Sequence, residues 1–191
     1  MNWIPDYNFI LASRSPRRQE LLRMLGISFT VSDSEVEETF PEGLLKSEIP
    51  VYLAKLKANP LLSALREKDL LITADTVVFL NGEIIGKPAN HAEAEEILQK
   101  LSGKEHQVIS GVCLSSVEKQ VSFHSMSKVR FKKLRTEEIQ FYIKTYKPFD
   151  KAGAYGIQEW IGLVGITRIE GSYTNIMGLP VHELYEAIIR F

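Results

Sequence analysis

The feature that most constrains the fold is the apolar run DLLITADTVVFL at residues 69–80, which carries one internal acid, Asp75. Its β-branched residues predict a strand, and Asn81-Gly82 predicts a two-residue turn into a second arm, EIIGKP. Burying a carboxylate without a partner is costly in free energy. We therefore expect Asp75 to lie at a strand end that faces a cleft, paired with a cation, a metal ion or water. An aspartate in a turn between two short strands is the alternative, which the absence of an accompanying glycine or asparagine disfavours.

A strand followed directly by a helix is predicted near the N-terminus. Residues 9–12 predict the end of a strand, and Ser15-Pro16 combines a helix N-cap with proline at the first helical position. The helix, expected to continue to Gly26, has Arg17 and Arg18 in its first turn, where the helix dipole favours acidic side chains by roughly 0.3–1 kcal/mol each. This unfavourable placement predicts an anion at the start of the helix.

A phosphate group is the anion that this segment suits. The start of a helix offers backbone N–H donors, Ser13 and Ser15 add hydroxyls, and Arg17 and Arg18 add guanidinium groups. Alternatively, the arginines point to solvent or pair with the acidic loop at residues 32–44, and these residues alone do not separate the two possibilities.

The rest of the chain alternates between predicted helices and strands without a linker rich in Gly, Ser or Pro, so we expect one domain over residues 1–191. Strand–helix alternation near the start, with hairpins later, predicts an α/β protein with a mixed sheet. Thr136 is expected to cap one of the later helices. The predicted helices cover residues 51–58, 90–102, 137–147 and 181–191, and further strands cover residues 106–116 and 120–134.

Charge and cysteine content limit the function classes. With 23 basic and 24 acidic residues, the net charge is −1, so no overall field attracts nucleic acid or an anionic membrane. The basic run at residues 128–135 leaves nucleic-acid binding as an alternative, although a solvated strand face fits the net charge better. The single cysteine, Cys113, excludes an internal disulfide, and no signal peptide or membrane-spanning apolar run is present, so we expect a cytoplasmic protein. The four histidines lack a zinc-binding spacing and are expected at surface or strand positions: His91, His106, His124 and His182.

Two lysines and a glycine-rich segment could join the phosphate-binding residues. Lys57 lies on a predicted helix, and Lys87 lies in the loop that follows the hairpin. The segment KAGAYGIQ at residues 151–158 ends in Gln158, whose amide could read the edge of a nucleotide base. Taken singly, each lysine is typical of an exposed surface charge, and the glycines fit a tight turn equally well.

Seven motifs follow one another from Leu11 to about Pro180: SRSPRRQELL, VEE, LAKLKA, ADTVV, GKP, KAGAYGIQ and GSYTNIMGLP. In order and spacing they resemble the motifs of the Maf family of nucleoside triphosphate pyrophosphatases. The resemblance implies an α/β fold with an elongated mixed central sheet, flanking helices and a deep cleft between two lobes, similar to the inosine triphosphatase architecture. It also implies a homodimer.

The resemblance assigns roles to individual residues. It implies that Asp75 is the catalytic residue that positions and deprotonates water. A divalent cation, Mg²⁺ or Mn²⁺, would be held by Glu37 and Asp75. The residues implied to bind the substrate are Ser13, Arg17, Arg18, Lys57 and Lys87. The residues that match the subgroup acting on dTTP and UTP are Arg17, Thr76 and Gln158.

The implied reaction is hydrolysis between the α- and β-phosphates of a nucleoside triphosphate, which yields the monophosphate and pyrophosphate. The substrate would be a normal pyrimidine nucleotide or a modified one that is removed before incorporation. An alternative is a nucleotide-binding regulator of septum formation with little turnover. The intact Asp75 beside complete cationic motifs weighs against that alternative.

Overall fold

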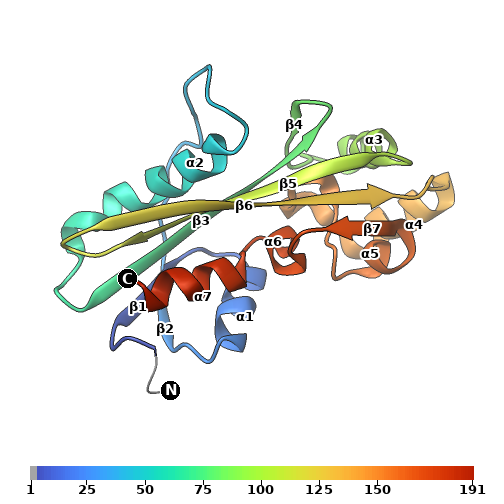
Figure 1. Ribbon diagram of the computed structural model, residues 1–191. Coiled ribbons are helices and arrows are strands. Elements are labelled where there is room, and N and C mark those ends of the chain that lie inside the picture. The colour runs from blue at the N-terminus through green and yellow to red at the C-terminus, as the bar shows by residue number, and fades with distance from the viewer. Residues whose placement is uncertain (1–3) are drawn as a thin grey trace. The chain divides into compact units, whose positions relative to one another are not determined.

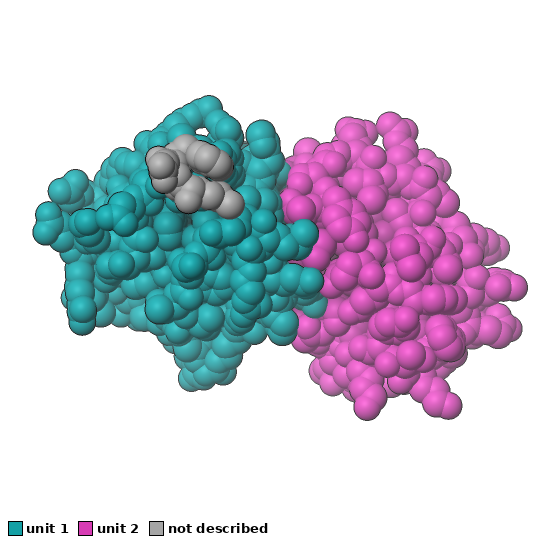
Figure 2. All heavy atoms as spheres, turned by 90° about the horizontal axis from the view of Figure 1, so that it is seen from below, with its two compact units in different colours: residues 1–76, 110–125, 178–191 teal, residues 77–109, 126–177 magenta. Residues whose placement is uncertain are grey.

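The computed structural model describes residues 4–191 and has a mixed α/β fold (Figure 1). Its seven-stranded sheet has the order β2-β1-β3-β5-β6-β7, with β4 paired to β3, and helices flank the sheet, which confirms the predicted fold class. The chain separates into two compact units (Figure 2). Unit 1 contains residues 1–76, 110–125 and 178–191, and unit 2 contains residues 77–109 and 126–177. The cleft that the resemblance implies stays a prediction.

The strand–helix pair predicted near the N-terminus is confirmed in unit 1. β1 (Asn8–Ala12) leads into α1 (Pro16–Met24), and Ser15 occupies the N-cap position. The first turn of α1 contains no acidic residue. Arg17 and Arg18 therefore lie at the positive end of the helix dipole, as expected.

The apolar run that contains Asp75 forms one strand, β3 (Asp69–Leu80), so the turn alternative is wrong. Every residue of β3 except Thr76 is buried, which explains why the run is continuously apolar rather than alternating. β3 pairs in parallel with β1 only as far as Ile72, which lies opposite Leu11. Asp75 thus lies in the middle of its own strand, so the expected position at a strand end is wrong, although the pairing of β3 with β1 ends before Asp75.

α2 (Glu48–Ala58) begins before the predicted start at Val51. Pro50 lies in the first turn, where a backbone N–H has no helical acceptor, so the proline does not delay the helix. α2 also approaches the backbone of β5 (Glu105–Ser115) closely, because a Cβ at Gly111 would lie 2.2 Å from the Pro50 carbonyl carbon. Gly111 thereby allows the helix that carries Lys57 to sit directly on the sheet of unit 1.

The remaining elements of unit 1 surround this contact. One core cluster of the unit joins strand and helix residues, namely Ala12, Ala54, Ala58, Leu71 and Cys113. The other elements are β2 (Phe29–Ser32), η1 (Asn59–Ala64), residues 110–115 of β5, residues 120–125 of β6 (Gln120–Phe131) and α7 (Val181–Ile189).

Unit 2 contains the predicted hairpin. Asn81 and Gly82 have φ values of 52° and 96° and connect β3 to β4 (Glu83–Ile85). Two consecutive positive φ values are what a type I′ turn requires, and asparagine followed by glycine adopts them readily. The turn places Lys87 just beyond the second arm of the hairpin.

The helices of unit 2 lie close to the predicted segments. In α3 (His91–Leu101), the Asn90 side chain caps the helix by accepting a hydrogen bond from the Glu93 N–H. α4 (Thr136–Tyr146) includes Thr136 as its first residue, so the expected cap at Thr136 is wrong. The Glu138 carboxylate accepts a hydrogen bond of 2.9 Å from the Arg135 N–H, which moves the start of the helix by one residue. The other elements are η2 (Pro148–Asp150), η3 (Ala152–Ala154), α5 (Trp160–Gly165), β7 (Ile166–Glu170) and α6 (Tyr173–Met177).

His106 belongs to the core of unit 2 rather than to a polar site. Its Nε2 lies 2.8 Å from the Tyr155 hydroxyl, and its ring stacks on Phe131. Burial lowers the pKa of His106 to about 4, so the ring is neutral at physiological pH.

None of the helices among residues 4–191 combines the length and the apolar composition needed to cross a membrane.

Candidate functional site

Asp75 lies in an ion-paired group in unit 1. The Lys57 ammonium donates to Asp75 Oδ1 at 2.5 Å and lies 2.8 Å from Glu38 Oε1. The side chains of Lys57 and Asp75 are only 13% and 10% exposed, whereas Glu38 is 44% exposed. The buried carboxylate of β3 therefore has the cationic partner that its sequence environment demanded.

The backbone of unit 1 fixes the position of Lys57. The Thr73 hydroxyl on β3 donates to the Ala54 carbonyl on α2 at 2.7 Å. Ala54 lies on the same helix as Lys57, and Thr73 lies on the same strand as Asp75. This hydrogen bond joins α2 to β3, so Lys57 and Asp75 are both presented by regular secondary structure and not by a loop.

Arg18 donates hydrogen bonds to the strand on both sides of Asp75. Its Nη1 donates to the Ala74 carbonyl at 2.8 Å, and its Nη2 donates to the Thr76 hydroxyl at 3.1 Å. Its Nε donates to the Gly178 carbonyl at 2.8 Å. Burial lowers the pKa of the Arg18 guanidinium, although the Asp75 carboxylate opposes this shift. Three of the five N–H donors of a guanidinium are thus used inside the protein.

The other residues of the first motif have different surroundings. Ser13 is half-buried, and its hydroxyl accepts a hydrogen bond of 3.2 Å from the Ser15 N–H. Arg14, which is exposed, pairs with Asp33 and with Glu35 of the acidic loop. Arg14 thus pairs with the acidic loop, which is the kind of contact that the sequence offered as an alternative for Arg17 and Arg18.

Arg17 is half-buried, and its positive charge lowers the pKa of the Arg18 guanidinium. The two arginines, which the sequence presents as a pair, repel one another. The hydrogen bonds of Arg18 to Ala74 and Thr76 reach the strand of Asp75.

The predicted site residues of unit 2 are Lys87 and Gln158, and both are exposed. The Gly153 N–H donates to the Gly86 carbonyl at 3.0 Å, which joins the glycine-rich segment to the residue before Lys87. The buried Lys151 ammonium lies 3.2 Å from Glu159 Oε1, directly after Gln158. Within unit 2 the segment that carries Gln158 is thus held by hydrogen bonding at one end and ion pairing at the other.

Sequence reasoning missed several residues of unit 1 that contact the predicted site residues, among them Glu38 and Gly178. Glu38 shares the Lys57 ammonium with Asp75, whereas the predicted ligand is Glu37; both glutamates are exposed. The motif VEE contains both glutamates, and only the loop conformation decides between them. The Gly178 carbonyl accepts from Arg18, and its motif gave no sign of that role. Among residues 4–191, no group of three or more His, Cys, Asp or Glu side chains is arranged to hold a metal ion.

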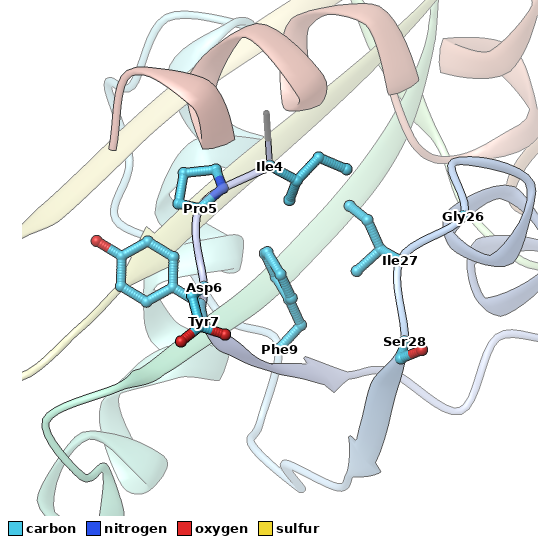
Figure 3. A pocket seen from close by; sticks show the side chains of 8 residues that line it. All are labelled: Ile4, Pro5, Asp6, Tyr7, Phe9, Gly26, Ile27 and Ser28. Carbon is cyan, nitrogen blue, oxygen red and sulfur yellow. The ribbon is translucent and has the colours of Figure 1, made fainter. Parts of the chain in front are cut away.

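A separate pocket of about 490 Å³ lies in unit 1 (Figure 3). Its lining includes Tyr7, Phe9 and Ile27 and none of the residues that the sequence assigned to the site. This pocket is therefore not the site that the motifs predict.

Comparison with known proteins adds independent information. Residues 8–191 match the family of Maf-like proteins. A relative from Phocaeicola vulgatus named dTTP/UTP pyrophosphatase is 53% identical over 183 residues, which cover 95% of each chain. A relative of the same name from Flavobacterium psychrophilum is 51% identical, and the match covers 92% of this chain and 90% of the relative. Another from Porphyromonas gingivalis is 47% identical, and the match covers 98% of this chain and 96% of the relative. The solved structure of the Staphylococcus aureus Ham1 protein aligns over 65% of this chain and 71% of its own, with 20% identity and a TM-score of 0.47. On the match over residues 8–191 and these identities, the chain belongs to the Maf family.

Proposed function

We propose that this protein hydrolyses dTTP and UTP to the nucleoside monophosphate and pyrophosphate. The relatives that cover nearly the whole chain bear the name dTTP/UTP pyrophosphatase. The single observation that carries the proposal is the buried Asp75 carboxylate held at 2.5 Å by the Lys57 ammonium, with the strand on either side bonded to Arg18. The intact Asp75 beside the cationic Lys57 and Arg18 weighs against a regulator without turnover.

The proposed reaction is a displacement at the α-phosphorus. Water forms a bond to phosphorus, the bond to the bridging oxygen breaks, and pyrophosphate leaves with that electron pair. Asp75 accepts the proton of the attacking water. A carboxylate has two oxygens, so Asp75 can accept from Lys57 through Oδ1 and act on water through Oδ2.

Neutralising the phosphate charge is the other demand of such a reaction. Lys57 is already placed next to Asp75, and Arg17 lies in the first turn of α1, where the helix start offers backbone N–H donors. Ser13, Arg18 and Lys87, which the family resemblance implies, complete the proposed phosphate-binding set. Because catalysis of phosphoryl transfer consists mainly of positioning and electrostatic stabilisation, this set needs no covalent nucleophile.

A divalent cation, Mg²⁺ or Mn²⁺, is part of the proposal. Asp75 and Glu38 converge on one point, the Lys57 ammonium, at 2.5 and 2.8 Å. Two carboxylates fit the one or two that Mg²⁺ uses where substrate phosphates supply further ligands. Asp75, together with Glu38 or with Glu37, which the family resemblance implies, would hold the ion. When bound, the ion would neutralise phosphate charge and make its water more acidic.

Recognition of the base is assigned to Gln158 within the proposal. Uracil and thymine present an N3 donor between two carbonyl acceptors, and an amide can accept from the one and donate to the other. Rotation of the amide would also match cytosine, so CTP must be compared directly.

The test is a screen of pyrophosphate release from dTTP, UTP, CTP and the purine triphosphates, with Mg²⁺ and with Mn²⁺. We expect kcat/KM for dTTP and UTP to exceed that for every other normal nucleotide by about tenfold or more, a margin of about 1.4 kcal/mol. Modified pyrimidine triphosphates form a second set in the same assay. Tight dTTP binding without pyrophosphate release would instead support the regulator.

Replacing Arg17 tests the unfavourable helix start. We expect Arg17→Ala to raise KM for dTTP about tenfold or more, because a charge that binds phosphate is lost. The empty protein should keep its thermal stability or gain slightly, since Arg17 repels Arg18 and opposes the helix dipole. Thermal unfolding with and without dTTP measures both effects. A marked loss of stability in the empty protein would assign Arg17 to a structural ion pair.

The partners and the location are also part of the proposal. We propose a cytoplasmic homodimer that binds nucleotides and does not bind nucleic acid. In support of the last point, Lys128 and Lys132 of the basic run lie 2.9 and 2.8 Å from Glu170 and Glu138, which reduces the net positive charge of that strand. Sedimentation equilibrium of the purified protein tests the dimer.

A further inference from the structure

Ser110 is a fully buried hydroxyl that no sequence motif singled out. It lies on β5, and its Oγ is 2.8 Å from the Thr76 Oγ1. The surrounding stretch of β5, from Val108 to Leu114, is otherwise apolar and buried. A hydroxyl at such a position is unfavourable unless its hydrogen bonds are made. Thr76, the residue next to Asp75, is a hydrogen-bonding partner of this buried hydroxyl.

The Thr76 hydroxyl makes three contacts in unit 1. Arg18 Nη2 lies at 3.1 Å, Ser110 Oγ at 2.8 Å and the Gly178 carbonyl at 3.3 Å. A guanidinium only donates and a carbonyl only accepts. Thr76 must then give its single proton to Gly178 and accept from Arg18, so Ser110 donates to Thr76.

This arrangement uses the full capacity of the Thr76 hydroxyl, which has one proton and two lone pairs. Nothing remains with which the hydroxyl could bind a nucleotide base. An effect of Thr76 on the reaction must therefore pass through the groups that it holds. The first of these is Arg18, whose guanidinium also donates to the carbonyl of Ala74 on the other side of Asp75.

The second group is the Gly178 carbonyl, which accepts from both Arg18 Nε and Thr76. Gly178 has φ of +114°, a conformation that other residues rarely adopt, and this backbone geometry turns the carbonyl toward Arg18. Arg18, Thr76, Ser110 and Gly178 thus form one closed hydrogen-bonded cluster, which we call the Arg18 clamp.

We propose that Ser110 is a positioning residue of the hydrolysis reaction, because its hydroxyl fixes Thr76 in the Arg18 clamp and the clamp sets the position of Asp75. This inference rests on the proposed function. It makes Thr76 a residue that acts through Arg18 rather than a group that contacts the base. Small displacements of a catalytic group lower turnover more than substrate affinity, because the precise geometry matters most in the transition state.

The first test is Ser110→Ala, assayed by pyrophosphate release from dTTP. We expect kcat to fall about tenfold while KM changes by less than about twofold. Ser115→Ala is the matched control, since Ser115 lies on the same strand, is equally buried, and bonds to Gln120 instead of the clamp. Ser115→Ala should keep the wild-type kcat. Equal losses of kcat in both variants would overturn the proposal, because they would indicate a general packing effect.

The second test is a double-mutant cycle with Thr76, which also serves if Ser110→Ala fails to fold. Thr76→Val removes the hydroxyl with little change in shape, and Thr76→Ser retains it. We expect Thr76→Val to lower kcat about tenfold, Thr76→Ser to recover most of that loss, and Ser110→Ala to add less than about twofold to Thr76→Val. Multiplicative losses, or Thr76→Ser as slow as Thr76→Val, would overturn the proposal.

The wild-type protein separates this inference from the proposed function. If the wild type releases pyrophosphate and Ser110→Ala matches it in kcat, the positioning role alone is overturned. If the wild type releases no pyrophosphate from any nucleotide, the proposed function is overturned, and the positioning role falls with it.

Discussion

Asp75→Asn should abolish nearly all pyrophosphate release from dTTP while nucleotide binding persists. Asparagine keeps the shape of the side chain and can still accept from Lys57, but it cannot take a proton from water. Loss of a positioned general base lowers turnover by about 10²–10⁴-fold, and we expect about 10³-fold here. Single-turnover kinetics give the rate, and calorimetry with dTTP gives the dissociation constant, which should stay within about fivefold of wild type. Turnover within tenfold of wild type would remove Asp75 from the catalytic role.

Asp69→Asn is the matched control for this variant. Asp69 lies on the same strand as Asp75, and each is 7% exposed. Its carboxylate accepts hydrogen bonds from the Asn8 side chain and from the Arg66 N–H, at 3.2 and 2.9 Å. Asp69→Asn should therefore change stability and leave kcat near wild type. If both variants lost turnover equally, the loss would come from the buried charge of the strand and not from catalysis.

Asp75 could be found from the sequence because its neighbours make it an anomaly. A carboxylate within a continuous apolar run needs a partner, and that demand follows from the desolvation of charge alone. The identity of the partner does not follow in the same way. Lys57 lies on a helix whose placement depends on the close approach at Gly111 and on the Thr73 hydrogen bond, and neither contact has a local sequence signal. From the residues alone the lysine was one candidate cation among several, and its role in the predicted site came from resemblance to a family.

Between two adjacent residues of the same type, the sequence also does not predict which one makes a given contact. Glu37 and Glu38 lie in a loop without helical or strand periodicity, so no pattern decides which side chain turns toward Lys57. Arg17 and Arg18 are adjacent, and adjacent residues on a helix point in different directions. The sequence predicts two cations at a helix start, but the bonds from Arg18 to Ala74 and Thr76 depend on the path of β3.

Arg18→Ala should destabilise the empty protein strongly as well as lower its turnover. Removing the guanidinium leaves the carbonyls of Ala74 and Gly178 without this donor and takes a positive charge from the neighbourhood of Asp75. The Gly178 carbonyl keeps its hydrogen bond from Thr76, whereas the buried Ala74 carbonyl loses its donor from Arg18, and a buried acceptor left unpaired costs about 1–3 kcal/mol. We expect the free energy of unfolding to fall by about 3 kcal/mol, which corresponds to roughly 6–12 °C in the melting temperature of a chain of this size. Denaturant titration of the empty protein measures the loss.

Arg18→Lys separates the two ways in which Arg18 could act. Lysine restores the positive charge but not the planar fork that donates to three acceptors at once. If Arg18 acts as a clamp on the strand of Asp75, Arg18→Lys should keep kcat at least tenfold below wild type. Recovery of wild-type turnover by lysine would show that charge alone is required, as for a phosphate-binding residue. Arg17→Ala, with its stability preserved and its KM raised, is the control that places the two neighbouring arginines in different roles.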